Sequence, residues 1–285
     1  MKTNIFFVLL FLFFAPVVSA QVTLKFNPEE KAKYSYKFDV KQNLSQQMLG
    51  QDMAITMNMS FTWDMTVLRK TTTDSEVEFT YRNILFLMDS PIFSFDYNSE
   101  IESENPNEMD KMLKNAFDAI IGKSITATIT NNGEVTSVKG TEELMSSAVG
   151  AKDLGVNFDE NSMKSIFEQS MKMYPNKPVN IGESWVTQQN MSQSGMPSLT
   201  INSTYTLKSV EKEIANIVVS SNISMSAGTG EQSVDFSGTQ TGNIKMVVKT
   251  GMQSEGNIVQ KLKGTLPNNI PLDLTSEVKI STENR

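Results

Sequence analysis

The chain contains no cysteine and no histidine among its 285 residues. The common zinc ligand sets, Cys–His nucleophiles and Ser–His–Asp triads are therefore unavailable. Disulfides are excluded too, so stability has to come from burial of apolar surface and from sheet pairing. Catalysis would have to use carboxylates, lysine, tyrosine or serine. We expect a protein that is not an enzyme and that has no catalytic residues, no cofactor and no metal.

Basic charge and long apolar runs are scarce as well. The formal net charge is −7, and the sequence offers no cluster of Lys and Arg of the kind that nucleic acid or an anionic membrane surface needs. After the N-terminus, no segment approaches the ~20 consecutive apolar residues of a transmembrane helix. We therefore expect no nucleic acid partner and no integral membrane span. The sequence does not indicate which protein partner the chain has.

The N-terminus carries the longest apolar run. Lys2 precedes the run Ile5–Phe14, and Val18-Ser19-Ala20 places small residues at the spacing of a cleavage site. This order is typical of a secretory signal peptide. We expect residues 1–20 to be removed and the protein to be periplasmic or secreted. It should not be a lipoprotein, because that anchor needs a cysteine after the signal.

A long alternating stretch, MAITMNMSFTWDMTV from Met53 to Val67, has apolar side chains at eight odd positions in a row. Successive side chains of a strand point to opposite faces, so the stretch predicts a strand with one continuously apolar face. At about 3.3 Å per residue it would run roughly 50 Å, against ~17–20 Å for an ordinary strand. Before it, Lys33–Val40 predicts a first strand, joined to the long one by a wide polar loop rich in glutamine.

Helical periodicity appears in the middle of the chain. Apolar residues recur every three or four positions over Met109–Ile121, which predicts an amphipathic helix. We expect a short helix from Thr141 and a longer one from about Asn161, while Asn132-Gly133 predicts a hairpin turn. The expected fold is α+β and β-dominated. It consists of a long antiparallel curved sheet, open and barrel-like or made of two related halves, packed against two or three amphipathic helices.

The domain organisation has two interpretations. One is a single β-rich domain over residues 21–285. The other is a pair of pseudo-repeated halves, 21–174 and 184–285, joined near 175–183, where two prolines and a glycine break the pattern. Each half carries a long amphipathic hairpin, but binary patterning makes any two such hairpins look alike.

Several segments carry a resemblance to a known family. YSYKFDV, the long alternating hairpin, ITNNGEVTSVKG and NKPVNIGESW follow the signal peptide in an order that resembles exported Bacteroidota proteins known as a domain of unknown function. The resemblance covers nearly the whole mature chain and implies a periplasmic or secreted location. It brings no catalytic residues. The architecture is also similar to lipid carriers with an open half-barrel and to tubular lipid-binding proteins, a likeness at the level of fold.

The apolar face of the long strand is the candidate site. The chain has 18 methionines, and methionine fills irregular gaps or lines surfaces that accept varied apolar partners. The candidate ligand-binding residues are Met53, Met57, Met59, Phe61 and Trp63 on the strand, with Met112 and Phe117 on the first helix.

Three functions remain open. The first is an exported non-catalytic protein that binds a lipid or another hydrophobic ligand in the bacterial envelope. The second is a structural or protein-interaction module in which the apolar face is a solid core. The third is a carboxylate-based hydrolase. An interior cavity lined by Met53, Met57, Phe61 and Trp63 would favour the first function, and a solid core would favour the second. A cleft that holds two facing carboxylates with raised pKa would favour the third.

Overall fold

The computed structural model describes residues 21–48, 51–104, 106–147, 159–191, 198–227 and 233–285. The expected signal peptide, residues 1–20, lies outside the described residues, so its prediction stays untested.

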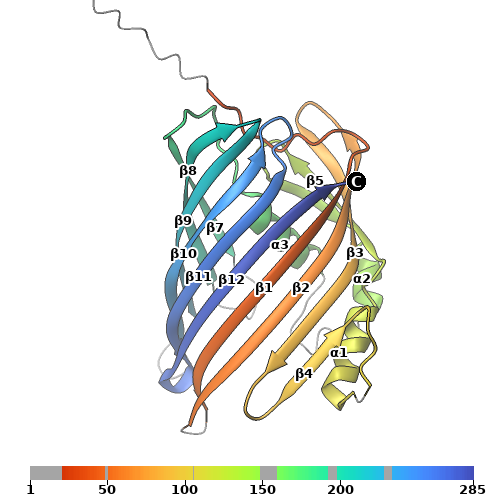
Figure 1. Ribbon diagram of the computed structural model, residues 1–285, viewed down its shortest axis with the longest axis vertical. Helices are drawn as coiled ribbons and strands as arrows, with labels where there is room; N and C mark the ends of the chain where they lie inside the picture. Colours follow the sequence, from red (N-terminus) through yellow and green to blue (C-terminus); the bar gives the residue numbers. More distant parts are fainter. Residues whose placement is uncertain (1–20, 49–50, 105, 148–158, 192–197, 228–232) are drawn as a thin grey trace, which may run out of the picture.

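The described part of the chain is β-dominated (Figure 1). Its strands are β1 (Lys33–Met48), β2 (Gln51–Lys70), β3 (Asp74–Asp89), β4 (Ser94–Asn98), β5 (Ser124–Thr130), β6 (Val135–Lys139), β7 (Ser184–Met191), β8 (Ser198–Glu211), β9 (Ile214–Ala227), β10 (Val234–Val247), β11 (Gln253–Leu266) and β12 (Ile270–Asn284). The helices are α1 (Glu108–Asp118), α2 (Thr141–Ser147) and α3 (Glu160–Met171), with a 3-10 turn at Pro267–Asn269.

All the strands join one antiparallel sheet. Their order is β6-β5-β3-β2-β1-β12-β11-β10-β9-β8-β7, and β4 pairs with β3 off this path. The last strand, β12, therefore lies between β1 and β11, and Figure 1 shows it beside the red-orange β1. The sheet curves around α3. The expected β-dominated fold with one long curved antiparallel sheet is confirmed.

The predicted long strand is confirmed, but the prediction of a wide loop before it is wrong. β2 spans Gln51–Lys70, and β1 continues past Val40 to Met48, so that Met48 pairs with Gln51. The glutamine-rich segment did not resemble a strand because most of its residues are polar, so it lacks the alternation of apolar and polar side chains. Polar side chains still allow the backbone ladder, and the long partner β2 supplies the hydrogen bonds along the whole segment.

The buried core continues under α1, with Leu113 and Phe117, and its larger part lies toward the upper end of the sheet in Figure 1. It contains the ends of the strands nearest the N-terminal segment, for example Met65 at 1% exposed and Leu207 at 0%. α3 packs on it, with the Phe167 ring stacked 4.7 Å from that of Phe79 on β3. At the other side of the sheet, the Gln189 amide of β7 donates to the carbonyl of Gln169, 3.1 Å away. α3 thus links strands near both edges of the sheet.

An N-terminal strap, residues 21–31, crosses the same end. Leu24 and Phe26 are each 1% exposed within the core. The Phe26 amide donates to the Asn131 carbonyl at 2.8 Å, and the Asn27 amide donates to the Thr250 carbonyl at 2.8 Å. The strap therefore ties the β5–β6 turn to the β10–β11 turn, two segments from opposite parts of the sheet.

α1 covers the edge of the sheet formed by β3 and β4. Asn107 caps the helix by accepting from the Asp110 amide, and Asp110 accepts in return from the Asn107 amide. This reciprocal capping box satisfies backbone donors that a helix start leaves free. The Tyr97 hydroxyl donates to Asp118 at 2.8 Å, which fastens the other end of α1 to β4.

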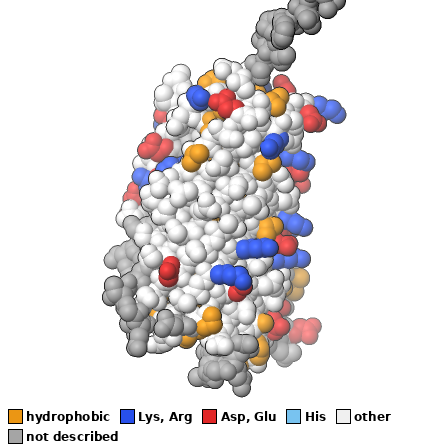
Figure 2. Space-filling model, turned by 90° about the vertical axis from the view of Figure 1, so that its left-hand side faces the viewer, with side chains coloured by type: hydrophobic (Ala, Val, Ile, Leu, Met, Phe, Trp, Pro, Cys, Tyr) orange, Lys and Arg blue, Asp and Glu red, His pale blue; other side chains and the backbone are white. Residues whose placement is uncertain are grey.

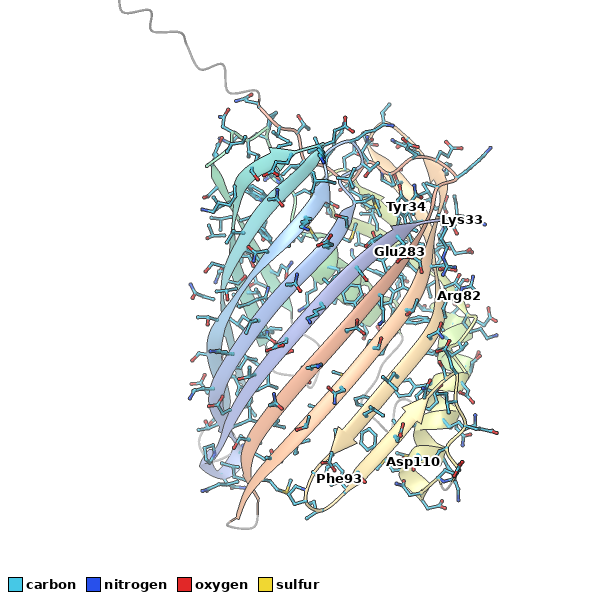
Figure 3. All side chains as sticks on the ribbon, viewed as in Figure 1. Lys33, Tyr34, Arg82, Phe93, Asp110 and Glu283 are labelled. Atoms are coloured by element: carbon cyan, nitrogen blue, oxygen red, sulfur yellow. The ribbon has the colours of Figure 1, made fainter. Side chains whose placement is uncertain are left out.

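The outer face of the sheet is polar. Ser, Thr and Asn occupy most outward positions of β8, β9 and β10, and Figure 2 shows a broad neutral surface with few charged side chains on that side. Charged side chains on the outer face pair across strands, as in Lys263–Asp273 and Lys245–Glu255, both at 2.7 Å. The alternation is visible at Lys33 and Tyr34, labelled in Figure 3, since Lys33 is exposed and Tyr34 is buried.

Strands from both proposed halves belong to one continuous sheet, joined by the β1–β12 pairing. The duplication itself stays a prediction. Among the described segments, none of the helices has the length and apolar character needed to cross a membrane.

Candidate functional site

The inner face of the sheet, the side toward α3, carries no charged residue on eight of its strands. Directly paired residues of antiparallel strands have their side chains on the same face, so the register defines this face. It comprises the even-numbered residues of β1 (34–46), β10 (234–246), β11 (256–264) and β12 (270–282), and the odd-numbered residues of β2 (53–67), β7 (185–189), β8 (199–207) and β9 (215–225). None of these positions holds Asp, Glu, Lys or Arg.

Apolar side chains below the core keep part of their surface accessible. We define the apolar zone as two register rows, Met59–Val40–Val278–Ile258 and Ile55–Leu44–Leu274–Leu262. Ile55 is 6% exposed, and the other seven are half-buried. A solid core would bury such residues almost completely. The apolar zone is therefore an accessible apolar surface on the concave side of the sheet.

The predicted site residues of β2 lie together along this face. Met53 is 6% exposed, while Met57 and Met59 are half-buried beside Gln42 and Val40 of β1. Phe61 and Trp63 pack against the core, at the border of the apolar zone. The structure thus aligns all five on one face, as alternation predicts.

The two predicted residues of α1 are placed differently. Phe117 is 9% exposed, and its ring meets that of Phe86 edge-on at 6.0 Å. Phe86 is the β3 partner of Met59, so Phe117 closes the inner face at the β3 edge. Met112 is half-buried on α1.

An aromatic cluster separates the core from the apolar zone. The Trp63 ring stacks 4.6 Å from that of Phe38 and 6.2 Å from that of Tyr36. Burial raises the pKa of Tyr36 well above its usual value, and burial also raises the pKa of Tyr205 on the far side of the sheet. These phenols stay neutral, so the inner face stays uncharged at physiological pH.

Two glycines shape the inner face at β10. A Cβ on Gly238 would overlap the carbonyl oxygen of Lys261, and one on Gly242 would overlap that of Asn257. Both positions are inward, so neighbouring backbone approaches closely where other residues would carry a side chain. Side chains of β11, Leu262 beside Gly238 and Ile258 beside Gly242, occupy the space on either side of Gln240.

Sequence reasoning missed a row of polar residues across the middle of the inner face. The register aligns Gln42, Ser276, Gln260, Gln240, Ser221 and Ser203 from β1 to β8. We call it the polar row. Its signal was the glutamine at position 42, in the segment that we expected to be a loop. Once the segment is a strand, alternation from Val40 places Gln42 inward.

Among the described residues, three glutamates, Glu29, Glu108 and Glu183, have a pKa below the usual value. Hydrogen bonds and charge from Lys249 lower the pKa of Glu29, and Lys111 does the same for the pKa of Glu108. A general acid needs a shift in the other direction. Within the described residues, no group of three or more metal-ligating side chains comes together.

Comparisons with known proteins place the chain in a family without an assigned activity. The sequence model of the Family of unknown function (DUF6263) matches residues 72–253. A comparison with curated proteins finds no match.

Solved structures show a likeness of fold. A lipovitellin structure, described as "Lipid-protein interactions in lipovitellin", is similar with a TM-score of 0.51 and 9% identity, over 90% of this chain and 25% of that chain. This chain thus spans a quarter of the lipovitellin chain. An outer membrane channel from Pseudomonas putida F1 aligns over 90% of this chain and 96% of that chain, with 7% identity. Its TM-score of 0.23 is too low to support an argument.

Proposed function

Because the chain belongs to the Family of unknown function (DUF6263), which supplies no activity, we propose from the geometry that it is a non-catalytic protein that binds a lipid or another apolar molecule. The ligand lies against the apolar zone on the concave side of the sheet. The observation that carries the proposal is that this face has no charge while its apolar side chains remain partly accessible. Each buried CH₂ of a ligand would gain about 0.8 kcal/mol there.

The likeness in fold to lipovitellin supports this proposal. That structure is described in terms of lipid–protein interactions, and its similar portion extends over 90% of this chain. The pattern of residues 1–20 supports export, so we propose that the protein acts in the envelope or outside the cell.

The interaction module remains the second candidate. The β3–β4 turn exposes Ile92 (61%) and Phe93 (43%), the latter labelled at the lower edge of Figure 3. An exposed apolar pair of this kind favours contact with a protein partner. Cross-linking in the native envelope, with Phe93→Ser as the comparison, would identify it. The hydrolase alternative gains no support from the lowered carboxyl pKa values.

Native mass spectrometry of the protein purified from its own source tests the lipid-binding proposal. We expect a reproducible adduct that disappears on solvent extraction, and a lipid in the extract. A mass equal to residues 21–285 alone, with no extractable lipid, would contradict the proposal.

Two adjacent residues of β11 provide matched variants. Ile258 faces inward and Val259 outward, where it is 38% exposed. Ile258→Glu places a charge against the ligand, which is costly to bury unpaired, and should abolish the adduct. Val259→Glu should keep it. Ile258→Ala, uncharged, should retain the adduct and shows that the position tolerates change. Equal adducts in Ile258→Glu and Val259→Glu would argue against binding on the inner face.

A further inference from the structure

The polar row divides the apolar zone. Gln42, Gln260 and Gln240 lie on β1, β11 and β10, with Ser276 of β12 between the first two. Adjacent strands are ~4.8 Å apart, so the row from Gln42 to Gln240 spans about 14 Å. Along the strands, each apolar row of the apolar zone is two residues away, about 7 Å. A ligand lying along the strands would meet apolar, polar and apolar surface in turn.

The two ends of the polar row differ in their hydrogen bonding. On β8 and β9, the hydroxyls of Ser203 and Ser221 bond to each other at 2.8 Å, and both residues are buried. The glutamine amides at 42, 240 and 260 are half-buried and have no hydrogen-bond partner among the described residues. Three amides that lie between two apolar rows of the concave surface are therefore available to another molecule.

The amide of Gln240 lies between two glycines of its own strand and is half-buried. Gly238 and Gly242 precede and follow it on the same face of β10, and neither carries a side chain that could cover it. The polar row thus presents donors and acceptors between the apolar rows of the inner face.

The chemistry of the row restricts the ligand. A glutamine amide offers two N–H donors and one carbonyl acceptor. An anionic head group would have to be buried against a face that holds no cation, at a large cost in desolvation. An ester carbonyl, an amide or a hydroxyl can bond to the amides without that cost. The polar row is suited to a neutral group within an apolar body.

We propose that the polar row recognises a neutral hydrogen-bonding group, an ester, amide or hydroxyl, in the middle of a long apolar ligand. This inference rests on the proposed lipid binding. It adds a ligand class, the neutral lipid, and names Gln42, Gln240 and Gln260 as the residues that select it.

Three probes of the same chain length test the selection. The delipidated full chain is titrated with cis-9-octadecene, methyl oleate and oleate, each delivered from cyclodextrin and measured by native mass spectrometry. The unmodified protein should bind the ester roughly fivefold to tenfold more tightly than the hydrocarbon, the effect of one or two hydrogen bonds. Oleate should bind no more tightly than the ester.

A triple variant, Gln42→Met, Gln240→Met and Gln260→Met, removes the amides and keeps the length of the side chains. It should bind ester and hydrocarbon within about twofold of each other, because no amide remains to favour the ester. The matched control is Gln46→Met, on the same face of β1 but outside the polar row, which should retain the preference. Single variants, each with a partial loss, serve if the triple variant does not fold.

The outcomes separate the two proposals. A triple variant that keeps the ester preference, or an unmodified protein that prefers oleate, would overturn the role of the polar row while leaving lipid binding in place. Failure of every probe to bind the unmodified protein would overturn the lipid-binding proposal, and this inference with it.

Discussion

Replacing Phe26 with alanine should lower the free energy of unfolding by about 3–5 kcal/mol, the range for a fully buried aromatic side chain. Phe26 is 1% exposed, and its ring lies 6.4 Å from that of Tyr174, whose hydroxyl donates to the Gly251 carbonyl. The cavity would open where the strap joins two distant turns, so the surroundings have little freedom to collapse. With a urea m-value of about 3 kcal/mol/M, the unfolding midpoint should fall by about 1.0–1.7 M.

Urea unfolding followed by circular dichroism measures this effect on the mature chain. Thr23→Ala is the matched control, since Thr23 lies in the same strap but is exposed, and its midpoint should move by less than about 0.2 M. A loss below about 1 kcal/mol for Phe26→Ala would refute the reasoning, because a fully buried phenylalanine cannot be removed so cheaply from a packed core. The strap would then contribute little to the fold.

Three further predictions concern the sheet and its aromatic residues. Gly242→Ala should destabilise the protein by about 1–3 kcal/mol, because the added Cβ would overlap the Asn257 carbonyl. Ser237→Ala, which changes an outward residue of the same strand, should leave the stability nearly unchanged in the same urea assay. Burial raises the pKa of Tyr81 to about 12, which favours the neutral phenol in the folded state. The free energy of unfolding should therefore hold up to pH 10 and fall as the pH rises toward 12. Tyr81→Phe should make this fall less steep, and an equally steep fall in the variant would contradict the raised pKa of Tyr81. In the variant Trp185→Phe, Trp63 is the remaining tryptophan and the source of the tryptophan fluorescence. Methyl oleate should shift the emission of Trp63 to the blue if the ligand lies beside Phe61. An emission that stays constant while the ligand is bound would place the ligand elsewhere.

Much of the fold could be predicted from the sequence, because the signals were strong and local. The alternation from Met53 to Val67 and the period of α1 each depend on residues within one element, so the face of every side chain follows directly. The extent of β1 could not be predicted, since its second half is polar and becomes a strand through pairing with β2. The order of the strands was equally hidden, because the β1–β12 pairing joins residues far apart in the sequence.

The candidate site was predicted in part for the same reason. The five residues of β2 share a face by alternation alone, and the structure aligns them. The polar row requires the register of β1 and β8–β12 together, and a single-strand pattern contains no information on register. Phe117 reaches the inner face through Phe86, a tertiary contact that helical period does not reveal.

The position of β12 has a consequence for the order of folding. Phe38 pairs with Ile280, so the backbone groups of β1 on that side have no partner until residues 270–284 have been synthesised. The two edges of β1 and β11 that later receive β12 are long and exposed meanwhile, and such edges pair readily with other chains. Closing so distant a contact is slow, since the loop entropy is lost before the pairing compensates for it. A nascent or truncated chain without β12 should therefore aggregate unless another protein covers these edges. Pairing of β12 with β1 and β11 completes the native sheet.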